Sequence, residues 1–131
     1  MNEIYQYLKN IGTFYLATSE GDQPRVRPFG AIDIFEGNLY IQTGNVKNVF
    51  AQMQKNPKVE ICAVGKDGTW MRVAATAVQD DRMEARQHML DENPGLKRRY
   101  AADDGNSEVL YLKDVTAIIY SFTGEPKTIK F

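Results

Sequence analysis

The strongest structural signal in the chain lies in residues 24–65, which read PRVRPFGAIDIFEGNLYIQTGNVKNVFAQMQKNPKVEICAVG. Two segments rich in β-branched and aromatic residues, RVRPFGAIDIF and LYIQT, flank the turn sequence EGN at residues 36–38, which predicts a β-hairpin. A helical pattern follows, and KVEICAVG then indicates a further strand. Tight turns between most of these strands predict antiparallel pairing.

The helix within this stretch is predicted to run from Val46 to Gln54. Asn45 is a suitable N-cap, apolar residues recur at three- and four-residue spacing, and Asn56-Pro57 ends the pattern. Lys47 would then lie in the first turn, where the partial positive charge of a helix N-terminus disfavours a cation by about 0.3–1 kcal/mol. Two interpretations follow: an exposed lysine whose small cost is tolerated, or a residue that shares a site with a bound phosphate.

The rest of the chain extends the same architecture. Residues 2–10 form a short amphipathic pattern, residues 81–92 predict a helix with acids at its start, and TFYLATS, TWMRVAATAVQ and SEVLYLKDVTAIIYSF indicate further strands. We expect one domain, residues 1–131, with the order helix, three strands, helix, two strands, helix, last strand. About six antiparallel strands in so small a domain predict a β-barrel with helices at its ends, because closure removes exposed edges.

Composition restricts the function. Sixteen Lys and Arg residues balance seventeen Asp and Glu residues, which argues against a broad electrostatic surface for nucleic acid or an anionic membrane, so any anion site must be local. No apolar run reaches the ~20 residues that span a bilayer, and the N-terminus lacks the pattern of a signal peptide, so we expect a cytoplasmic protein. A single Cys62 and a single His88 exclude an intrachain disulfide and the usual zinc ligand sets, and we expect no metal site. We expect Cys62 to be a buried, inert thiol and His88 to be a surface or half-buried histidine.

Several residues of the strands are candidates for a binding site. Arg25 and Arg27 lie two residues apart and so share one face of a strand, either as solvated side chains or as anion ligands. Pro28 removes a ladder donor and predicts an edge or a bulge, and Gly30 permits a close backbone approach. The RPFG segment therefore predicts a local break in the strand where a flat ligand could lie against the main chain. Trp70 and Arg72 share a face of a later strand, and a lone tryptophan most often belongs to the core or to a subunit interface.

Taken together, residues 24–65 followed by TWMRVAATAV resemble the FMN-binding split-barrel family typified by pyridoxamine 5'-phosphate oxidase. The resemblance extends from about Ile11 to Val78. It implies a mainly β protein, an antiparallel split β-barrel with peripheral helices, that binds FMN between the two subunits of a homodimer.

The resemblance also implies which residues hold the cofactor. The phosphate would be bound by Arg27 and Lys47, with Arg25 as an alternative to Arg27, and this would explain a lysine at the start of the helix. Thr43 resembles the hydroxyl ligand of the family, and Asn48 lies where another side-chain contact could reach. The remaining expected contacts are Pro28, Phe29, Gly30 and Gln42 around the isoalloxazine ring, with the partner subunit's Trp70 and the partner subunit's Arg72 completing the pocket.

The chain departs from the oxidase in being much shorter and in having no tryptophan or paired arginine in its last strand, so conversion of pyridoxamine phosphate is not expected. We predict a flavin-dependent oxidoreductase that transfers hydride or electrons between a reductant, for which a nicotinamide is a candidate, and a small-molecule acceptor. One alternative is a flavin, deazaflavin or haem carrier or sensor without turnover. Another is a nucleic-acid-binding barrel that uses Arg25, Arg27, Phe29 and Tyr40, against which the near-neutral charge argues.

Overall fold

The computed structural model describes all residues, 1–131, and consists of eight strands, three α-helices and one 3₁₀ turn. In chain order the elements are α1 (Asn2–Ile11), β1 (Phe14–Glu20), β2 (Gln23–Phe29), β3 (Ile32–Phe35), β4 (Asn38–Gly44), α2 (Asn48–Lys55), β5 (Lys58–Val64), β6 (Trp70–Asp80), α3 (Met83–Glu92), η1 (Pro94–Arg98), β7 (Ser107–Tyr120) and β8 (Lys127–Lys130). The three helices fall where they were expected in the order of elements, but the single strand expected at RVRPFGAIDIF is two strands, β2 and β3. Four strands therefore lie between α1 and α2 where three were expected, and the C-terminal region contributes the additional short strand β8.

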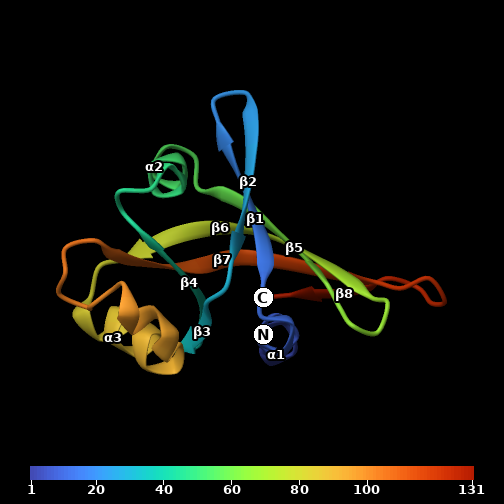
Figure 1. The fold of residues 1–131 in the computed structure, drawn as a ribbon. Coiled ribbons are helices and arrows are strands. Elements are labelled where there is room, and N and C mark those ends of the chain that lie inside the picture. The colour runs from blue at the N-terminus through green and yellow to red at the C-terminus, as the bar shows by residue number, and fades with distance from the viewer.

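All strand pairs are antiparallel, and the sheet follows the order β2-β1-β5-β6-β7-β4-β3, with β8 paired to β7. The path ends at β2 and β3, which are consecutive in the chain but do not pair with each other. The barrel is therefore split at this point and not closed by a ladder. Figure 1 shows the β1–β2 hairpin projecting beyond the rest of the sheet.

Turn chemistry and side-chain alternation account for the strands. The predicted β3–β4 hairpin is present, and its two turn residues, Glu36 and Gly37, have φ values of 49° and 77°, the left-handed conformation that two-residue hairpin turns need. Along β1, β5 and β6 every second side chain is buried, with Leu16, Ile61 and Val73 fully inside. This period of two places one apolar face on the core and leaves the other outside.

The helices cover the two sides of the sheet. In Figure 1, α2 lies above β6 and β7, and α1 and α3 lie below them. Helix α2 packs against β1 and β4, α1 against β3 and β5, and α3 against β3 and β7. Edge strand β3 is thereby covered by two helices, and α2 is held next to the base of the projecting hairpin. None of the helices has the length and apolarity that crossing a membrane would need.

The predicted start of α2 is wrong by two residues. The helix begins at Asn48 with Lys47 as its N-cap, and Val46, expected on the apolar face, is 80% exposed. Asn45 does not cap the helix, because its side-chain amide donates to the Gly105 carbonyl (2.8 Å) and to Glu108 Oε2 (2.9 Å). These long-range partners take Asn45 out of the capping position. The third helix likewise starts later than expected, at Met83.

Candidate functional site

A pocket of about 760 Å³ lies where the split end of the sheet meets the start of α2 and the segment after α3. This volume suits a drug-sized ligand or cofactor. The wall combines several cationic side chains with exposed backbone, and its residues are Lys9, Arg27, Pro28, Phe29, Gly30, Ala31, Gln42, Thr43, Lys47, Val49, Glu92, Asn93, Pro94, Gly95, Leu96, Arg98, Arg99 and Tyr100. Seven of the predicted site residues therefore meet in one pocket: Arg27, Pro28, Phe29, Gly30, Gln42, Thr43 and Lys47.

Arg27 is fixed on three sides. Its Nη1 donates to Thr18 Oγ1 (2.7 Å) and to the Leu16 carbonyl (3.2 Å) on β1, and its Nη2 donates to Gln52 Oε1 on α2 (2.6 Å). None of these acceptors is charged, so the guanidinium keeps its full positive charge without an ion-pair partner. Burial lowers the pKa of Arg27, and the neighbouring Arg25 lowers this pKa further. An anion in the pocket would relieve both effects.

Arg25 has a different environment. Its guanidinium pairs with Glu20 Oε1 at 2.8 Å, with both side chains about half exposed, and it does not line the main pocket. Hydrogen bonds from Arg25 and Gln52 lower the pKa of Glu20. Glu20 lies across the β1–β2 hairpin, where the antiparallel ladder brings it to Arg25. Of the two arginines that the sequence left as alternatives, Arg27 is the one whose charge faces the pocket.

Lys47 stands at the N-terminus of α2, where no acid lies in the first turn and no side chain caps the helix. Its amino group makes no hydrogen bond or ion pair within the chain. The first backbone N–H groups of any helix lack intrahelical acceptors and carry partial positive charge. Lys47 also lines a smaller cavity of about 520 Å³ that continues past Asn48 to Arg25 and Arg27. The helix start and the cationic side chains therefore lie around one cavity in a nearly neutral chain, the arrangement that an anion would favour.

Two deeply buried polar side chains face the same pocket with unused hydrogen-bonding atoms. Gln42 and Thr43 at the end of β4 are 6% and 3% exposed. The Gln42 amide nitrogen donates to the Thr43 carbonyl (3.2 Å) and to Ser107 Oγ (3.3 Å), but Gln42 Oε1 and Thr43 Oγ1 have no partner in the chain. No fully buried side-chain polar atom lacks a partner, so these atoms reach the pocket surface. Such groups need a ligand or water.

The backbone of Pro28 and Phe29 borders the pocket on edge strand β2, as Pro28 predicted. The predicted break in the strand lies at the end of the RPFG segment, after Phe29 and not at Pro28. The ladder with β1 runs without a shift through the pair Phe14 and Phe29, and the chain leaves the sheet only at Gly30 and Ala31. Proline is accommodated without a bulge because its missing N–H faces outward from an edge strand.

The sequence analysis missed the wall formed by α1 and η1. Lys9 Nζ donates to the Glu92 carbonyl (3.2 Å) and to Asn93 Oδ1 (3.0 Å), which fixes the start of the η1 segment beside the pocket. Arg98 and Arg99 follow and line the pocket. The only signal for them in the sequence is the basic run KRR at residues 97–99, which does not indicate a pocket.

Trp70 and Arg72 lie outside this pocket in the same chain. The Trp70 ring stacks on Tyr120 with 4.2 Å between ring centroids, and Arg72 Nη2 donates to the Tyr120 hydroxyl (2.6 Å). Trp70 is half-buried and therefore not a core residue. The three side chains form a cluster on the outer face of the sheet. From there Trp70 and Arg72 do not reach the pocket of their own chain.

Cys62 and His88 also lie away from the pocket. Cys62 is only partly buried, contrary to the prediction, because the alternation of β5 turns Ile61 inward and Cys62 outward. His88 is half-buried as expected, and its Nδ1 lies 2.6 Å from Oδ2 of the buried Asp33. Burial raises the pKa of Asp33, and the contact with His88 opposes that rise.

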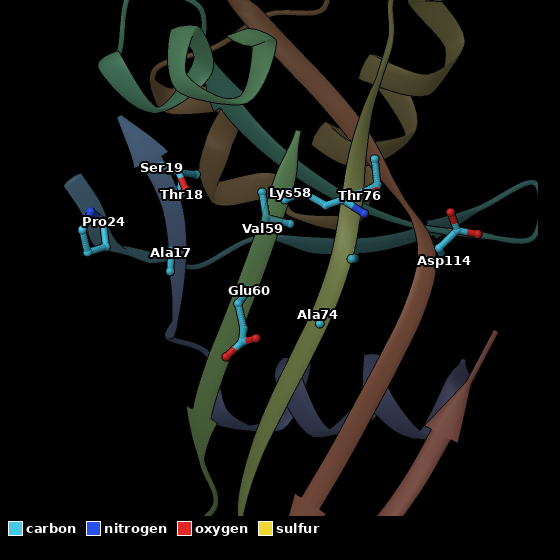
Figure 2. Close-up of a pocket in the computed structure, with 11 residues that line it drawn as sticks. Ala17, Thr18, Ser19, Pro24, Lys58, Val59, Glu60, Ala74, Thr76 and Asp114 are labelled. Carbon is cyan, nitrogen blue, oxygen red and sulfur yellow. The ribbon is translucent and has the colours of Figure 1, made fainter. Parts of the chain in front are cut away.

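A second depression, of about 410 Å³, lies on the outer face of β1, β5 and β6. Figure 2 shows its floor of small side chains such as Ala17 and Ala74, with Glu60 between them and Asp114 standing apart on β7. Ala17, Glu60 and Ala74 are cross-strand neighbours. The depression holds one lysine, Lys58, and no buried polar atom without a partner. It is a poorer candidate site than the cationic pocket.

Comparison with known proteins agrees with this geometry. A crystal structure of a NimC/NimA family protein from Clostridium acetobutylicum is 47% identical in sequence, with a TM-score of 0.97 over 100% of this chain and 92% of that chain. A pyridoxamine 5'-phosphate oxidase-related, FMN binding protein from Nostoc punctiforme is more distant, with 16% identity and a TM-score of 0.65 over 98% of this chain and 92% of that chain. A heme binding protein from Mycobacterium smegmatis has 15% identity and a TM-score of 0.69 over 96% of this chain and 57% of that chain. At such identities the likeness shows the fold alone. No curated protein matches the sequence.

The family model of pyridoxamine 5'-phosphate oxidase matches residues 1–118, which is most of the chain. The split barrel described above is also the fold of the structural relatives. The resemblance found in the sequence is thereby confirmed, and the protein belongs to the pyridoxamine 5'-phosphate oxidase family.

Proposed function

We propose that this protein binds FMN in the cationic pocket and acts as a flavin-dependent oxidoreductase on a small-molecule acceptor. The observation that carries the proposal is the convergence of Arg27, Lys47 and the N-terminus of α2 on one pocket. A phosphate monoester is the ligand that such a site suits best, since it accepts hydrogen bonds from backbone N–H groups and guanidinium together. The FMN-binding fold relative adds support by analogy.

The residues of the pocket have separate roles in this proposal. Arg27 and Lys47 hold the phosphate. Thr43 and Asn48 lie at the same end of the site, where they line the two cavities next to Lys47. The free Gln42 Oε1 accepts a hydrogen bond from the ring system, and the backbone from Pro28 to Gly30 forms a flat wall beside it. Bound FMN supplies hydride and electron transfer, and the protein needs no acid or base of its own for this chemistry. A nicotinamide is our candidate reductant.

We further propose that the functional unit is a homodimer. Trp70, Arg72 and Tyr120 form an ordered cluster on the outer sheet face, and Tyr15 and Val64 on the same face are 48% and 67% exposed. An exposed surface of aromatic and aliphatic side chains is typical of subunit interfaces. Sedimentation equilibrium tests this proposal: Val64→Arg should shift the mass from two chains to one, whereas a monomeric wild type would contradict it.

A carrier or sensor without turnover is the second candidate. The heme-binding fold relative raises haem as its ligand, but His88 and Cys62, two common axial ligands, do not line the pocket. FMN therefore remains the favoured cofactor for either function. Reduction by a nicotinamide separates the two functions, because a carrier would hold FMN and stay oxidised while an oxidoreductase would lose its visible absorbance and regain it with an acceptor.

The first experiment is a visible absorption spectrum of the purified protein, repeated after addition of FMN and desalting. We expect flavin bands at about one equivalent per chain, shifted from those of free FMN by the less polar pocket. A protein that is colourless and retains no FMN after desalting would contradict the proposed function. Adding riboflavin in a parallel sample tests the phosphate site, since riboflavin lacks the group that Arg27 and Lys47 are proposed to bind.

A further inference from the structure

Two adjacent arginines of the pocket differ from all others in the chain. The sequence contains seven arginines, and five of them donate side-chain hydrogen bonds: Arg25, Arg27, Arg72, Arg82 and Arg86. Arg98 and Arg99 make no side-chain hydrogen bond and no ion pair, and both line the pocket. Partnerless guanidinium groups are thus confined to one place on the molecule, and that place is the candidate site.

The backbone that carries these two arginines is held firmly. Asn93 Nδ2 donates to the Ile32 carbonyl (3.1 Å), which ties the start of η1 to edge strand β3. The Arg99 N–H and the Tyr100 N–H both donate to the Leu96 carbonyl, at 3.0 and 2.9 Å. Lys97, the first residue of the basic run, pairs instead with Asp91 at 2.9 Å. Arg98 and Arg99 are therefore the two members of the run left available to the pocket.

The charges of the pocket exceed what one phosphate would need. Arg27 and Lys47 together match the charge of a phosphate monoester, which is about −1.5 to −2 at neutral pH. Arg98, Arg99 and Lys9 add three more cations to the wall, and Glu92 is the only acid there. In a chain with a formal net charge of −1, this excess is local. It is compensated when a second anion occupies the η1 side of the pocket.

We propose that Arg98 and Arg99 form a subsite for the oxyanion, carboxylate or phosphate, of a small organic second substrate. The proposal deepens the proposed function and rests on it, because it assigns the substrate class to the flavin site. Arginine suits this role since its planar fork matches both oxyanions with two parallel hydrogen bonds. Arg98 at the end of η1 and Arg99 directly after it are both exposed, which leaves the subsite open to a substrate that enters and leaves.

The test is calorimetric titration of the FMN-loaded protein with benzoate, phenyl phosphate and the neutral benzamide. We expect both anions to bind at least about tenfold more tightly than benzamide, and R98Q/R99Q to remove this preference, because charge-assisted bonds are about twice as strong as neutral ones. The affinity for FMN should stay within about threefold of wild type, since the cofactor phosphate lies with Arg27 and Lys47. Benzoate bound in preference to phenyl phosphate would identify a carboxylate substrate, and the reverse order a phosphate.

A matched control is K113Q/K130Q, which also removes two positive charges, but from exposed lysines that do not line the pocket. An equal loss of anion binding in this control would overturn the proposal, as would equal affinities for benzoate and benzamide in the wild type. A large loss of FMN affinity in R98Q/R99Q would also overturn it, because the arginines would then serve the cofactor.

The same titration on the cofactor-free chain separates this proposal from the proposed function. If the wild type retains no FMN, the flavin assignment fails while benzoate binding that depends on Arg98 and Arg99 still supports the anion subsite. Benzoate binding that disappears in Arg27→Ala and persists in R98Q/R99Q would assign the anion to the other end of the pocket and contradict the subsite.

Discussion

Arg27 and Gln52 are joined by a hydrogen bond of 2.6 Å from Nη2 to Oε1, which links edge strand β2 to helix α2. The same glutamine oxygen accepts from Thr18 Oγ1, and its amide nitrogen donates to Glu20 Oε2 (3.1 Å). Gln52 is buried, although it sits on a short surface helix. One neutral side chain therefore orients the cation of the candidate phosphate site without neutralising it.

Gln52→Leu should weaken both the fold and the site. The change leaves the Thr18 hydroxyl and part of the Arg27 guanidinium without acceptors, which costs about 1–3 kcal/mol of unfolding free energy. FMN affinity should fall as well, because Arg27 is no longer held toward the pocket. Urea denaturation and FMN fluorescence titration measure the two effects. Gln54→Leu, on the exposed side of the same helix, is the control, and an equal effect of both variants would contradict the assigned role.

Arg27→Ala and Lys47→Ala should each weaken FMN binding by about tenfold or more, since a hydrogen bond to a charged group contributes about 1.5–3 kcal/mol. Circular dichroism should show an intact fold in both. Riboflavin binding should change much less, because it lacks the phosphate.

Arg25→Ala is the matched control for this pair, since Arg25 is already paired with Glu20 on the surface. We expect near wild-type FMN affinity. If Arg25→Ala weakened FMN binding and Arg27→Ala did not, the phosphate would belong with Arg25, the alternative that the sequence left open. Unchanged affinity in both Arg27→Ala and Lys47→Ala would remove the phosphate site altogether.

Gly44→Ala should disturb the pocket through Tyr100. A methyl group on Gly44 would lie 3.0 Å from the Tyr100 hydroxyl and 3.1 Å from Asn106 Oδ1, closer than most packing contacts, so that these side chains would have to shift. We expect the free energy of unfolding to fall by about 1–3 kcal/mol, as for other overpacked sites. In the Tyr100→Phe background the hydroxyl is absent, so the cost of Gly44→Ala should be smaller. Thermal unfolding of the wild type, the two single variants and the double variant measures this coupling. Strictly additive effects would show that Tyr100 does not contact the new methyl group.

Local sequence patterns were sufficient to predict the framework of this protein. The segments TFYLATS, KVEICAVG and TWMRVAATAVQ located β1, β5 and β6. Of the two positions that the missing N–H of Pro28 predicted, an edge or a bulge, the structure has the edge. The start of α2 was wrong because Asn45, a good N-cap in isolation, bonds to residues about sixty positions away. Local propensity was overruled there by tertiary contacts.

The candidate site could be predicted only in part, for the same reason. Its β2 and α2 side lies within the contiguous stretch that carries the family pattern, from Arg27 to Lys47. The η1 side depends on contacts between distant segments, such as Lys9 with Asn93 and Asn93 with Ile32. No periodicity or turn signal in KRR indicates that two of its members face the pocket. Arg98 and Arg99 can be recognised as arginines without a partner only in the structure, because it shows the partners of the other five arginines.

Asp80 gives a stability prediction that is independent of any ligand. It accepts a hydrogen bond from the buried Tyr40 hydroxyl (2.7 Å), and Arg82 Nη2 lies 2.9 Å from the same Oδ2. Arg82 is the main cause that lowers the pKa of Asp80 to about 2, with Tyr40 contributing, and burial opposes this shift. The carboxylate side chain is 8% exposed while Arg82 is about half exposed, so solvent screens one side of the pair.

A carboxyl group with a lowered pKa in the folded state stabilises the protein above its unfolded pKa, and this contribution is lost as pH falls toward 2. Asp80→Asn should therefore cost about 1–2 kcal/mol at neutral pH, after allowance for screening at Arg82. The difference between wild type and variant should narrow between about pH 5 and about pH 2 as the wild-type carboxylate becomes protonated. Urea denaturation of both proteins across this pH range measures the difference in their unfolding free energy.

The control for Asp80 is Glu36→Gln, which removes the second acid paired with Arg82, at 2.9 Å, from a half-exposed position. Since exposed ion pairs contribute about 0–1 kcal/mol, its effect on unfolding free energy should be small at every pH. A stability difference for Asp80→Asn that stays constant from neutral pH down to about pH 2 would show that the amide loses packing or hydrogen bonds and not a charge interaction. The coupling of Asp80 to Arg82 would then have no energetic role.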